Sequence, residues 1–589
     1  MKAFTEPLLS LAGFEEMTKT AEKSSGLISV TGCIDAQKSQ MIYAFGGHRK
    51  NKLIVTFGEQ KAKELYDEYS FFDKEVVYYP SKDVLFYQSD IRGNLLTAER
   101  IRALKAIREQ ESVTLVTTFD ALMNTMAPIE KMWENVLTLE QGQLLDLKEI
   151  QAALIRMGYE KEYQVQTMGQ FSVRGGILDV FPLTEENPIR IELWGDEIDT
   201  IRYFDCESQK SIENIDRVSI YPAAELVLSD EEKAGGIEKL KAEAKRVSDK
   251  LRKQMKTEEA HRVTVMADEL IEEWGELSMY AGMDAFLSYF FDERVGLLDY
   301  FNPSDSLIFF DELTRCTEQG KLTETEFSES MKQRLAMGYI LPGQMNGLFT
   351  EKEIVAKLEK YSCIALGALD NKANGLHQLG SYGIHCQSVS PYNNSFELLI
   401  KDLKRYKKNG YRVILLSGSR TRAKRLSEDI TDQGITCFYT ENYDHELSEG
   451  QIMVCYGKVR RGFEYPILKF AVITESDIFG AQQKKKKRHR TYEGEKIQSF
   501  TDLSVGDYVV HENHGLGIYR GIEKLEVDKK VKDYIKIEYQ GGSNLYILAT
   551  QLDMIQKYAG KDARKPKLNK LGGQEWTRTK NRVRGAVKQ

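Results

Sequence analysis

Short apolar runs rich in β-branched residues alternate with amphipathic stretches along the first 135 residues. The runs cover residues 27–31, 53–57, 76–79 and 114–117, and stretches of helical periodicity such as 97–110 lie between them. Strand, helix and strand at this spacing are typical of a parallel sheet covered by helices. The pattern therefore predicts an α/β domain that begins with residues 1–135.

The pattern changes to strict alternation between residues 136 and 223. Ile189, Ile191 and Leu193 alternate there with Arg190 and Glu192. Successive strand residues point to opposite faces, so this period of two predicts antiparallel strands with one core side and one polar side. We interpret 136–223 as an antiparallel insertion domain. The α/β pattern returns over 224–345, including the apolar run 307–310, and completes the first domain.

Four further segments follow. Residues 346–480 are predicted to form an additional α/β domain, with strands at 413–416 and 470–474, and 481–500 a basic linker. Four apolar runs separated by Gly, Asn, Asp and Lys between residues 501 and 560 predict a small SH3/Tudor-like β-barrel, in which Gly515, Gly517 and Gly521 permit tight bends. Residues 561–589 form a second basic linker without a helix-terminating signal. We expect the chain to be part of a larger protein.

The composition fits this multidomain interpretation. A chain of 589 residues is too long for one core, and 41% hydrophobic with 29% charged residues is ordinary for a folded protein. No apolar run reaches the roughly 18 residues that cross a bilayer, and residues 1–13 lack a signal-peptide layout. We therefore expect a cytoplasmic protein without a membrane partner. The seven cysteines are scattered without a Cys-x-x-Cys pair, so reduced thiols and no metal are expected.

The net charge of −7 excludes a uniformly basic coat, but two segments are strongly basic. Residues 484–490 read Lys-Lys-Lys-Lys-Arg-His-Arg, and 561–589 hold ten Lys or Arg against two acids, a net of +8. Such runs are either solvated linkers or contacts with DNA phosphate, and the sequence leaves both open.

A degenerate phosphate-binding loop follows the first apolar run. The pattern Gly-x-x-x-x-Gly-Lys-Ser is kept except at the second glycine, which Gln37 replaces. A glycine at that position lets backbone amides close around phosphates. Another strand ends in Asp-Glu, an arrangement that holds magnesium and orients water. No helicase-type Gln-x-x-Gly-Arg-x-x-Arg stretch occurs in the sequence. We predict a degenerate nucleotide site without hydrolysis, formed by Gly32, Gln37, Lys38, Ser39, Asp311 and Glu312.

A second glycine-containing loop, Ser417-Gly418-Ser419-Arg420, opens a helix that carries further arginines. A helix N-terminus of this kind binds phosphate in some proteins. The sequence favours the simpler interpretation of a capped helix with a solvated basic face.

Several longer motifs are specific. They are VRGGILDVFP at 173–182, WGDEID at 194–199, TESDIFG at 474–480, VVH with HGLG at 509–517, and KLGG with Trp576. Through them nearly the whole chain resembles the bacterial transcription-repair coupling factors, the Mfd family, and its first half also resembles the repair helicase UvrB. The resemblance implies a UvrB-like module, an extra α/β domain, a polymerase-interaction barrel, and a linker to a double-stranded DNA translocase motor. That motor lies beyond these residues in the family. ATP and magnesium are therefore expected only for it, and no catalytic residue or cofactor is expected here.

The same resemblance implies that the insertion domain binds UvrA through a polar face with an exposed aromatic. By alternation Arg190 and Glu192 share that face, and the resemblance adds three neighbours. The alternative is an ordinary surface ion pair at Arg190, worth at most about 1 kcal/mol. The predicted UvrA-binding residues are Lys161, Arg174, Phe181, Arg190 and Glu192.

The barrel segment 501–560 holds seven Lys or Arg and nine acids, a balance poorly suited to phosphate. A protein partner is favoured, and the family supplies the β subunit of RNA polymerase. Leu525 is either an exposed anchor ringed by charge or a core residue, and pairing through a strand edge is expected. The predicted contact residues are Lys524, Leu525, Glu526 and Val527.

The function implied by these features is an interaction scaffold that binds stalled RNA polymerase and recruits UvrA, with upstream double-stranded DNA bound mainly by the motor. The alternative is a DNA-dependent ATPase or a UvrB-like damage-binding enzyme. No tyrosine-dense hairpin of the UvrB kind follows the first α/β segment, which argues against that alternative. A regulator of the CarD type would explain only the barrel.

Overall fold

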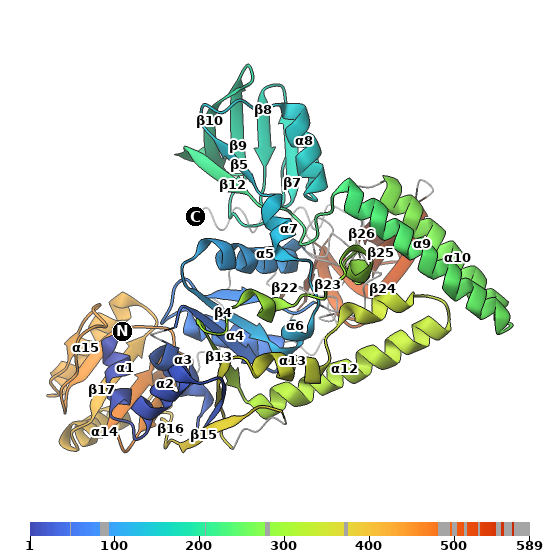
Figure 1. Cartoon of the computed structure of the whole chain (residues 1–589). Helices are drawn as coiled ribbons and strands as arrows, with labels where there is room; N and C mark the ends of the chain where they lie inside the picture. The colour runs from blue at the N-terminus through green and yellow to red at the C-terminus, as the bar shows by residue number, and fades with distance from the viewer. Residues whose placement is uncertain are drawn as a thin grey trace.

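The computed structural model describes residues 1–46, 49–82, 94–206, 208–276, 283–369, 375–480, 495–496, 503–511, 515–527, 530–548, 555–558 and 568–569. An α/β body carries an insertion domain at the top of Figure 1, and a second α/β unit lies at its lower left. Residues from 495 onward form a separate antiparallel sheet. Within the described part, none of the helices has the length and apolar character needed to span a membrane.

The body is built on seven parallel strands in the order β15-β1-β14-β13-β2-β4-β3. These strands are β1 Gly26–Thr31, β2 Asn51–Thr56, β3 Val77–Tyr79, β4 Val113–Thr118, β13 Ser306–Asp311, β14 Ser362–Leu366 and β15 Gln378–Gly383. The predicted parallel sheet is confirmed, and the run 307–310 lies at its centre as strand β13. β4 and β13 are buried along their whole length, as expected when helices cover both faces.

The predicted boundary between residues 345 and 346 is wrong. Strand β14 pairs in parallel with both β1 and β13, and β15 pairs with the other edge of β1. The run Ser362–Leu366 is buried at all five positions, which suits the middle of this sheet rather than the start of another domain. The first α/β unit therefore extends past residue 383.

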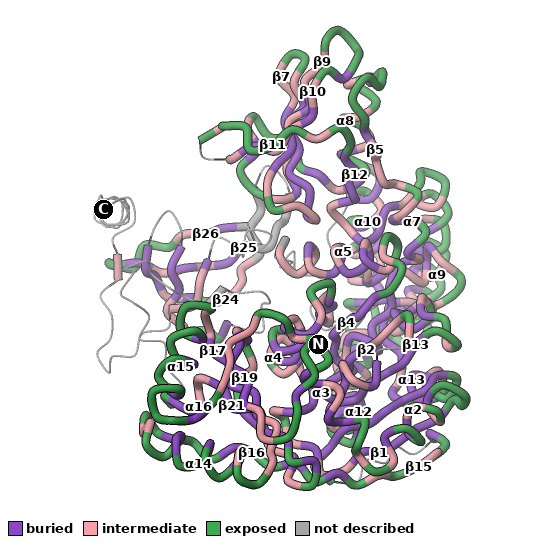
Figure 2. Tube along the Cα trace, turned by 90° about the vertical axis from the view of Figure 1, so that its left-hand side faces the viewer, coloured by how far each residue is buried: buried purple, intermediate pink, exposed green. Residues whose placement is uncertain are grey.

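Helices pack on both faces of this sheet, and Figure 2 shows buried residues along its central strands. One core includes Leu53, Val55 and Phe310, and the other includes Ile54 and Phe309. The longest helices are α9 Asp230–Lys253, which starts with a Ser229–Glu232 capping box, α10 Thr257–Glu276 and α12 Leu313–Ala336. The shorter helices that follow the strands include α3 Asp35–Gly46, α4 Glu59–Tyr69, α5 Asn94–Glu109, α6 Phe119–Met123, α7 Ile129–Glu134 and α13 Glu351–Leu358, and the chain starts with α1 Lys2–Leu9 and α2 Phe14–Lys23.

The insertion domain is an antiparallel sheet with one covering helix. Its six strands follow the order β11-β10-β9-β8-β7-β6, and β6 alone pairs in parallel. They are β6 Glu160–Lys161, β7 Gln170–Arg174, β8 Ile177–Val180, β9 Ile189–Trp194, β10 Glu197–Phe204 and β11 Ser211–Ile215; β5 Leu137–Glu140 pairs with β12 Arg217–Ile220, and α8 spans Leu147–Arg156. Leu154 of α8 packs with Ile189 and Ile191, so the helix covers one face and leaves the other open.

The second α/β unit follows β15. Its sheet has the order β16-β20-β21-β17-β19-β18, and α14 and α15 pack on one face. Its elements are β16 Gln387–Ser388, α14 Phe396–Lys408, β17 Arg412–Ser417, α15 Arg420–Asp432, β18 Phe438–Tyr439, β19 Ile452–Tyr456, β20 Phe463–Tyr465, β21 Phe470–Thr474 and α16 Glu475–Phe479. The other face, with Met453 and Tyr465, shares one hydrophobic core with Phe4 and Phe71 of the first unit. The two units are therefore joined by common packing.

The last segment is a small antiparallel sheet in the order β22-β27-β23-β24-β25-β26. Its strands are β22 Glu495–Lys496, β23 Tyr508–His511, β24 Gly515–Val527, β25 Lys530–Glu538, β26 Asn544–Leu548 and β27 Ile555–Lys557. The register between β24 and β25 shifts next to Gly521, whose φ of +104° lies where other residues are strained. A side chain at Gly517 would lie 2.5 Å from Ile537. These two glycines therefore permit the bend and the close packing of the sheet.

Candidate functional site

The open face of the insertion sheet carries the polar residues predicted from alternation. Ile189 and Ile191 of β9 are fully buried, and Arg190 and Glu192 point to the other side. Asp179 on β8 pairs directly with Arg190, and Arg174 on β7 is close to both. The structure thus brings Arg174, Arg190 and Glu192 onto one face, as predicted.

A buried carboxylate holds the two arginines of this face. Asp179 is 1% exposed and accepts hydrogen bonds from Arg174 Nη2 at 2.7 Å and from Arg190 Nε and Nη2 at 2.7 and 2.8 Å. Arg190 also donates to Gln209 at 2.8 Å and lies over the ring of Phe204 at 4.3 Å. The hydrogen bonds to Asp179 raise the pKa of Arg190. Arg190 is therefore fixed in a network, unlike a mobile surface ion pair.

Glu192 belongs to a second pair on the same face. It accepts hydrogen bonds from both terminal nitrogens of Arg202, one of them at 2.9 Å, and from Thr200 Oγ1 at 3.3 Å. The hydrogen bond from Arg202 lowers the pKa of Glu192, so its carboxylate stays charged at neutral pH.

Two predicted residues do not contribute to this face as expected. Phe181, expected as the exposed aromatic, is only 8% exposed. Lys161 pairs with Phe171, which faces the core, and its amino group donates to Gln151 of α8 at 2.7 Å. Lys161 therefore lies on the helix-covered side of the sheet, where its amino group is bonded to α8.

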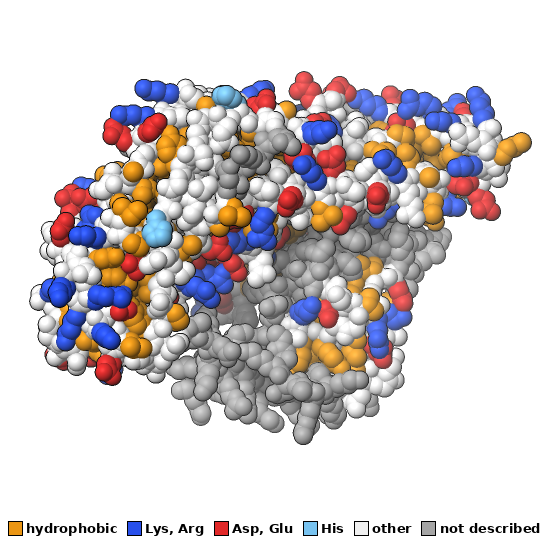
Figure 3. All heavy atoms as spheres, turned by 90° about the horizontal axis from the view of Figure 1, so that it is seen from below, with side chains coloured by type: hydrophobic (Ala, Val, Ile, Leu, Met, Phe, Trp, Pro, Cys, Tyr) orange, Lys and Arg blue, Asp and Glu red, His pale blue; other side chains and the backbone are white. Residues whose placement is uncertain are grey.

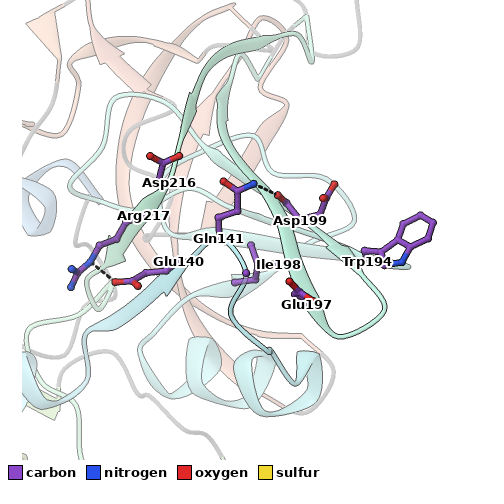
Figure 4. Close-up of a pocket in the computed structure, with 9 residues that line it drawn as sticks. Glu140, Gln141, Trp194, Glu197, Ile198, Asp199, Asp216 and Arg217 are labelled. Carbon is purple, nitrogen blue, oxygen red and sulfur yellow. Dashed lines mark hydrogen bonds and ion pairs between the residues drawn. The ribbon is translucent and has the colours of Figure 1, made fainter.

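An exposed aromatic of the open face is Trp194, which is 84% exposed. It ends β9 at the turn to β10, and Gly195 in this turn has a φ of +66°. Figure 4 shows its ring pointing away from the neighbouring side chains. The sequence held the signal for it, because Trp194 has the same strand parity as Arg190 and Glu192.

A depression of about 680 Å³ lies beside Trp194 (Figure 4). Its floor is fixed by the hydrogen bond from Gln141 Nε2 to the Asp199 carbonyl at 2.7 Å, and Arg217 pairs with Glu140 at 3.2 Å. The charged side chains are four carboxylates and one guanidinium, so the depression suits a cationic group of a partner. Its lining is Glu140, Gln141, Gly142, Trp194, Glu197, Ile198, Asp199, Asp216 and Arg217.

The predicted degenerate nucleotide site is brought together in the first α/β unit. Lys38 is 1% exposed, and its amino group lies 2.5 Å from Asp311 Oδ1, 2.9 Å from Glu312 Oε1 and 3.2 Å from Asp35 Oδ1. Asp311 also accepts a hydrogen bond from Thr56 at 2.9 Å. Burial disfavours the charge of Lys38, but the attraction of Asp311 and Glu312 and the hydrogen bonds to both together outweigh it, so the pKa of Lys38 is raised.

The loop before Lys38 does not fit a phosphate. The amides of Gly32 and Cys33 donate to the carbonyls of Ala368 and Gly367 at 3.2 and 3.0 Å. The chain after β14 thus takes the first two amides of the loop, which are then not free to bind an anion. Gln37 and Ser39 are also buried, at 0% and 2% exposed.

The second loop is the capped helix that the sequence favoured. Ser419 accepts a hydrogen bond from the amide of Arg422 at 3.2 Å and caps α15. Glu475 accepts hydrogen bonds from the Gly418 amide at 2.5 Å and from Ser417 at 3.0 Å, and it pairs with Arg422. The protein's own carboxylate therefore occupies the position of an anion.

The predicted polymerase contact lies in the hairpin of β24 and β25. Val527 pairs with Lys530 at its tip, whereas β23 pairs with β24 only as far as Ile518 and β26 reaches only Tyr534 of β25. Between these last pairs and the tip, both edges of the hairpin are therefore unpaired among the described strands. The side chains of Lys524, Leu525, Glu526 and Val527 lie outside the described part, as do the basic runs 484–490 and nearly all of 561–589.

Comparison with known proteins identifies two domain types within the chain. Residues 137–226 match a family model described as the UvrB interaction domain, and residues 503–559 match the CarD-like/TRCF RID domain. The insertion domain and the antiparallel sheet near the end are thus both of known type.

Similar proteins cover nearly the whole chain. A transcription-repair-coupling factor of Bacillus subtilis is 32% identical over 537 residues, 91% of this chain and 45% of the relative. Those of Staphylococcus haemolyticus and Staphylococcus aureus are 31% and 30% identical over 95% and 98% of the chain, and 47% and 48% of the relatives. The chain spans slightly less than half the length of these relatives. With two matching domains and this coverage, the chain is similar to the transcription-repair-coupling factors over nearly its whole length.

Proposed function

We propose that this chain is the scaffold part of a transcription-repair coupling factor, which binds stalled RNA polymerase through its β subunit and recruits UvrA for excision repair. The observation that carries the proposal is the open face of the insertion domain. It combines an almost fully exposed Trp194 with arginines held by Asp179, within the domain that matches the UvrB interaction domain. An exposed aromatic beside fixed arginines is the composition of an interface hot spot.

The polymerase contact is proposed for the hairpin of β24 and β25, within the segment that matches the CarD-like/TRCF RID domain. The open strand edges support recognition by strand addition, in which backbone groups supply hydrogen bonds and side chains supply specificity. We assign the surrounding sheet to the SH3/Tudor-like barrels because of its strong bend at Gly521 and its small buried core.

Leu525→Arg is expected to abolish capture of RNA polymerase while the barrel stays folded. The backbone pairing of Leu525 with Lys532 lies in the two-stranded extension, beyond the reach of β23 and β26. The substitution would replace an apolar anchor of the proposed contact with a charge. The measurement is pull-down of purified polymerase by the 589-residue chain.

Val505→Arg is the matched control, because Val505 is 68% exposed in the turn before β23 and lies outside the hairpin. It should bind polymerase like the unchanged chain. Undiminished binding by Leu525→Arg would assign the contact to another surface. Loss of the folded barrel in that variant alone would instead identify Leu525 as a core residue.

The alternative of a DNA-dependent ATPase is less well supported. Its phosphate loop has its first amides bonded to other carbonyls, and Lys38 is bound to Asp311 and Glu312. We therefore assign no nucleotide cofactor to these residues. The site residues are proposed to have a structural role.

A further inference from the structure

Three loops meet at one edge of the second α/β unit, where the parallel strands β17, β19 and β21 end. The amide of Gly457, after β19, donates to the Ser417 carbonyl at the end of β17 at 3.0 Å. Ser476, after β21, donates to the carbonyl of Arg460 at 2.5 Å. These bonds fix the loops against one another. In open α/β sheets, ligands bind at this carboxyl edge of the strands.

Positive charge is concentrated on two of these loops. Residues 418–425 contain four Lys or Arg and no acid, and residues 457–462 contain three and no acid, in a chain of net charge −7. Figure 3 shows Lys and Arg side chains among acidic and apolar ones over the surface of this unit. We name as the basic edge the exposed residues Arg420, Arg422, Lys424, Arg425, Lys458 and Arg461.

The internal ion pairs leave most of this charge available. Arg420 pairs with Glu441 at 3.2 Å, and Arg422 pairs with Glu475. Among the described residues, no ion pair is formed by the four other members of the basic edge, which are Lys424, Arg425, Lys458 and Arg461. The paired arginines fix the geometry of the helix start. The four others are exposed, and the amino group of Lys424 lies 5.4 Å from the centre of the Tyr439 ring.

The chemistry of the basic edge distinguishes between partners. A protein interface is expected to have a central apolar or aromatic anchor. Here most residues between the cations are small or polar, such as Gly418, Ser419 and Thr421. The neighbouring rings of Tyr439 and Tyr456 are half-buried and lie under Lys424 and Arg420. Closely spaced cations without such an anchor fit a regular array of phosphates. We propose that the basic edge binds the phosphate backbone of a nucleic-acid duplex, independently of base sequence.

The test is fluorescence anisotropy of a labelled DNA duplex of about 30 base pairs with the 589-residue chain, across a series of salt concentrations. The variant Lys424→Ala/Arg425→Ala/Lys458→Ala/Arg461→Ala removes the four unpaired cations. Each lost phosphate contact lowers the slope of log affinity against log salt by about 1, so we expect a slope smaller by about 3 to 4. Affinity at low salt should fall about tenfold or more.

The matched control is Lys241→Ala/Lys245→Ala/Lys250→Ala/Lys253→Ala, which removes four exposed lysines from α9. It changes the net charge equally and should leave the slope unchanged. An equal loss in both variants, or no loss in the basic-edge variant, would overturn the proposal. With an RNA duplex of the same sequence, the basic-edge variant and the control should differ in the same way, because the expected contacts are to phosphates. A basic-edge variant that binds both duplexes normally but loses an acidic protein ligand would reassign the surface to protein.

Discussion

Replacing Trp194 with alanine should weaken binding of the chain to UvrA by at least about 2 kcal/mol, roughly 30-fold in Kd. The ring is 84% exposed in the free chain, so its removal takes away no core packing. Its burial by a partner would remove a large apolar surface from water beside arginines already held in place by Asp179. The measurement is titration calorimetry with purified UvrA, together with the thermal unfolding midpoint of the variant.

Ile155→Ala is the control for this prediction, because Ile155 is 41% exposed on α8, which covers the opposite face of the sheet. It should bind UvrA normally. Trp194→Phe should lose less affinity than Trp194→Ala, since it keeps an aromatic ring. If Trp194→Ala binds UvrA as tightly as the unchanged chain, the open face is not the UvrA contact.

Charge reversal at Arg190 is a weaker test of the same face. Arg190 donates two hydrogen bonds to Asp179, which is 1% exposed, so a glutamate at position 190 would place two carboxylates together in a buried site. We expect that variant to destabilise the insertion domain. Lost UvrA binding could then result either from the missing arginine or from the destabilised domain, whereas Trp194→Ala changes only the surface.

Alternation along β9 was enough to predict which residues share the open face. It could not show that Phe181 is covered, because Phe181 lies past the end of β8 and its exposure depends on tertiary contacts. The same alternation extends to Trp194, where the strand ends in a tight turn and the ring is 84% exposed. The sequence thus predicts which face of the sheet a strand residue lies on better than it predicts how far that residue is buried.

The domain boundary was missed for a different reason. The run Ser362–Leu366 has the composition of a buried strand in either α/β unit, and its partners β1 and β13 are distant in sequence. Pairing between distant strands leaves no local signal. The shared core of the two units, which includes Phe71 and Tyr465, further blurs any boundary that a local pattern could mark.

The degenerate phosphate loop was predicted from Gln37 alone, and the structure adds a second obstacle. The carbonyls of Gly367 and Ala368 accept the amides at the start of the loop, and Gly32 could not be replaced, since a side chain there would lie 2.1 Å from the Ile384 carbonyl. These contacts come from residues more than 300 positions away. A motif comparison considers only the loop and does not reveal them.

Lys38→Met is the second change with a large expected effect, and it separates a structural role from a nucleotide-binding one. The methionine would leave Asp311, which is 1% exposed, with only Thr56 as a donor in a buried site. Removing one partner of a buried ion pair typically costs about 3 to 5 kcal/mol. We therefore expect a clear loss in the unfolding midpoint of the first α/β unit, measured by thermal or denaturant unfolding without nucleotide.

The double variant Lys38→Met/Asp311→Asn completes this test. It removes the isolated charge and keeps an acceptor for the Thr56 hydroxyl, so much of the lost stability should return. A lysine kept for nucleotide would behave differently: magnesium-ATP would raise the midpoint of the unchanged chain by ligand linkage, and Lys38→Met would abolish only that increase. We expect millimolar magnesium-ATP to leave the midpoint unchanged, because Gln37 replaces the loop glycine, Lys38 is paired with Asp311 and Glu312, and the first two loop amides are bonded to Gly367 and Ala368. A nucleotide-dependent rise in the unchanged chain would contradict the structural role of Lys38.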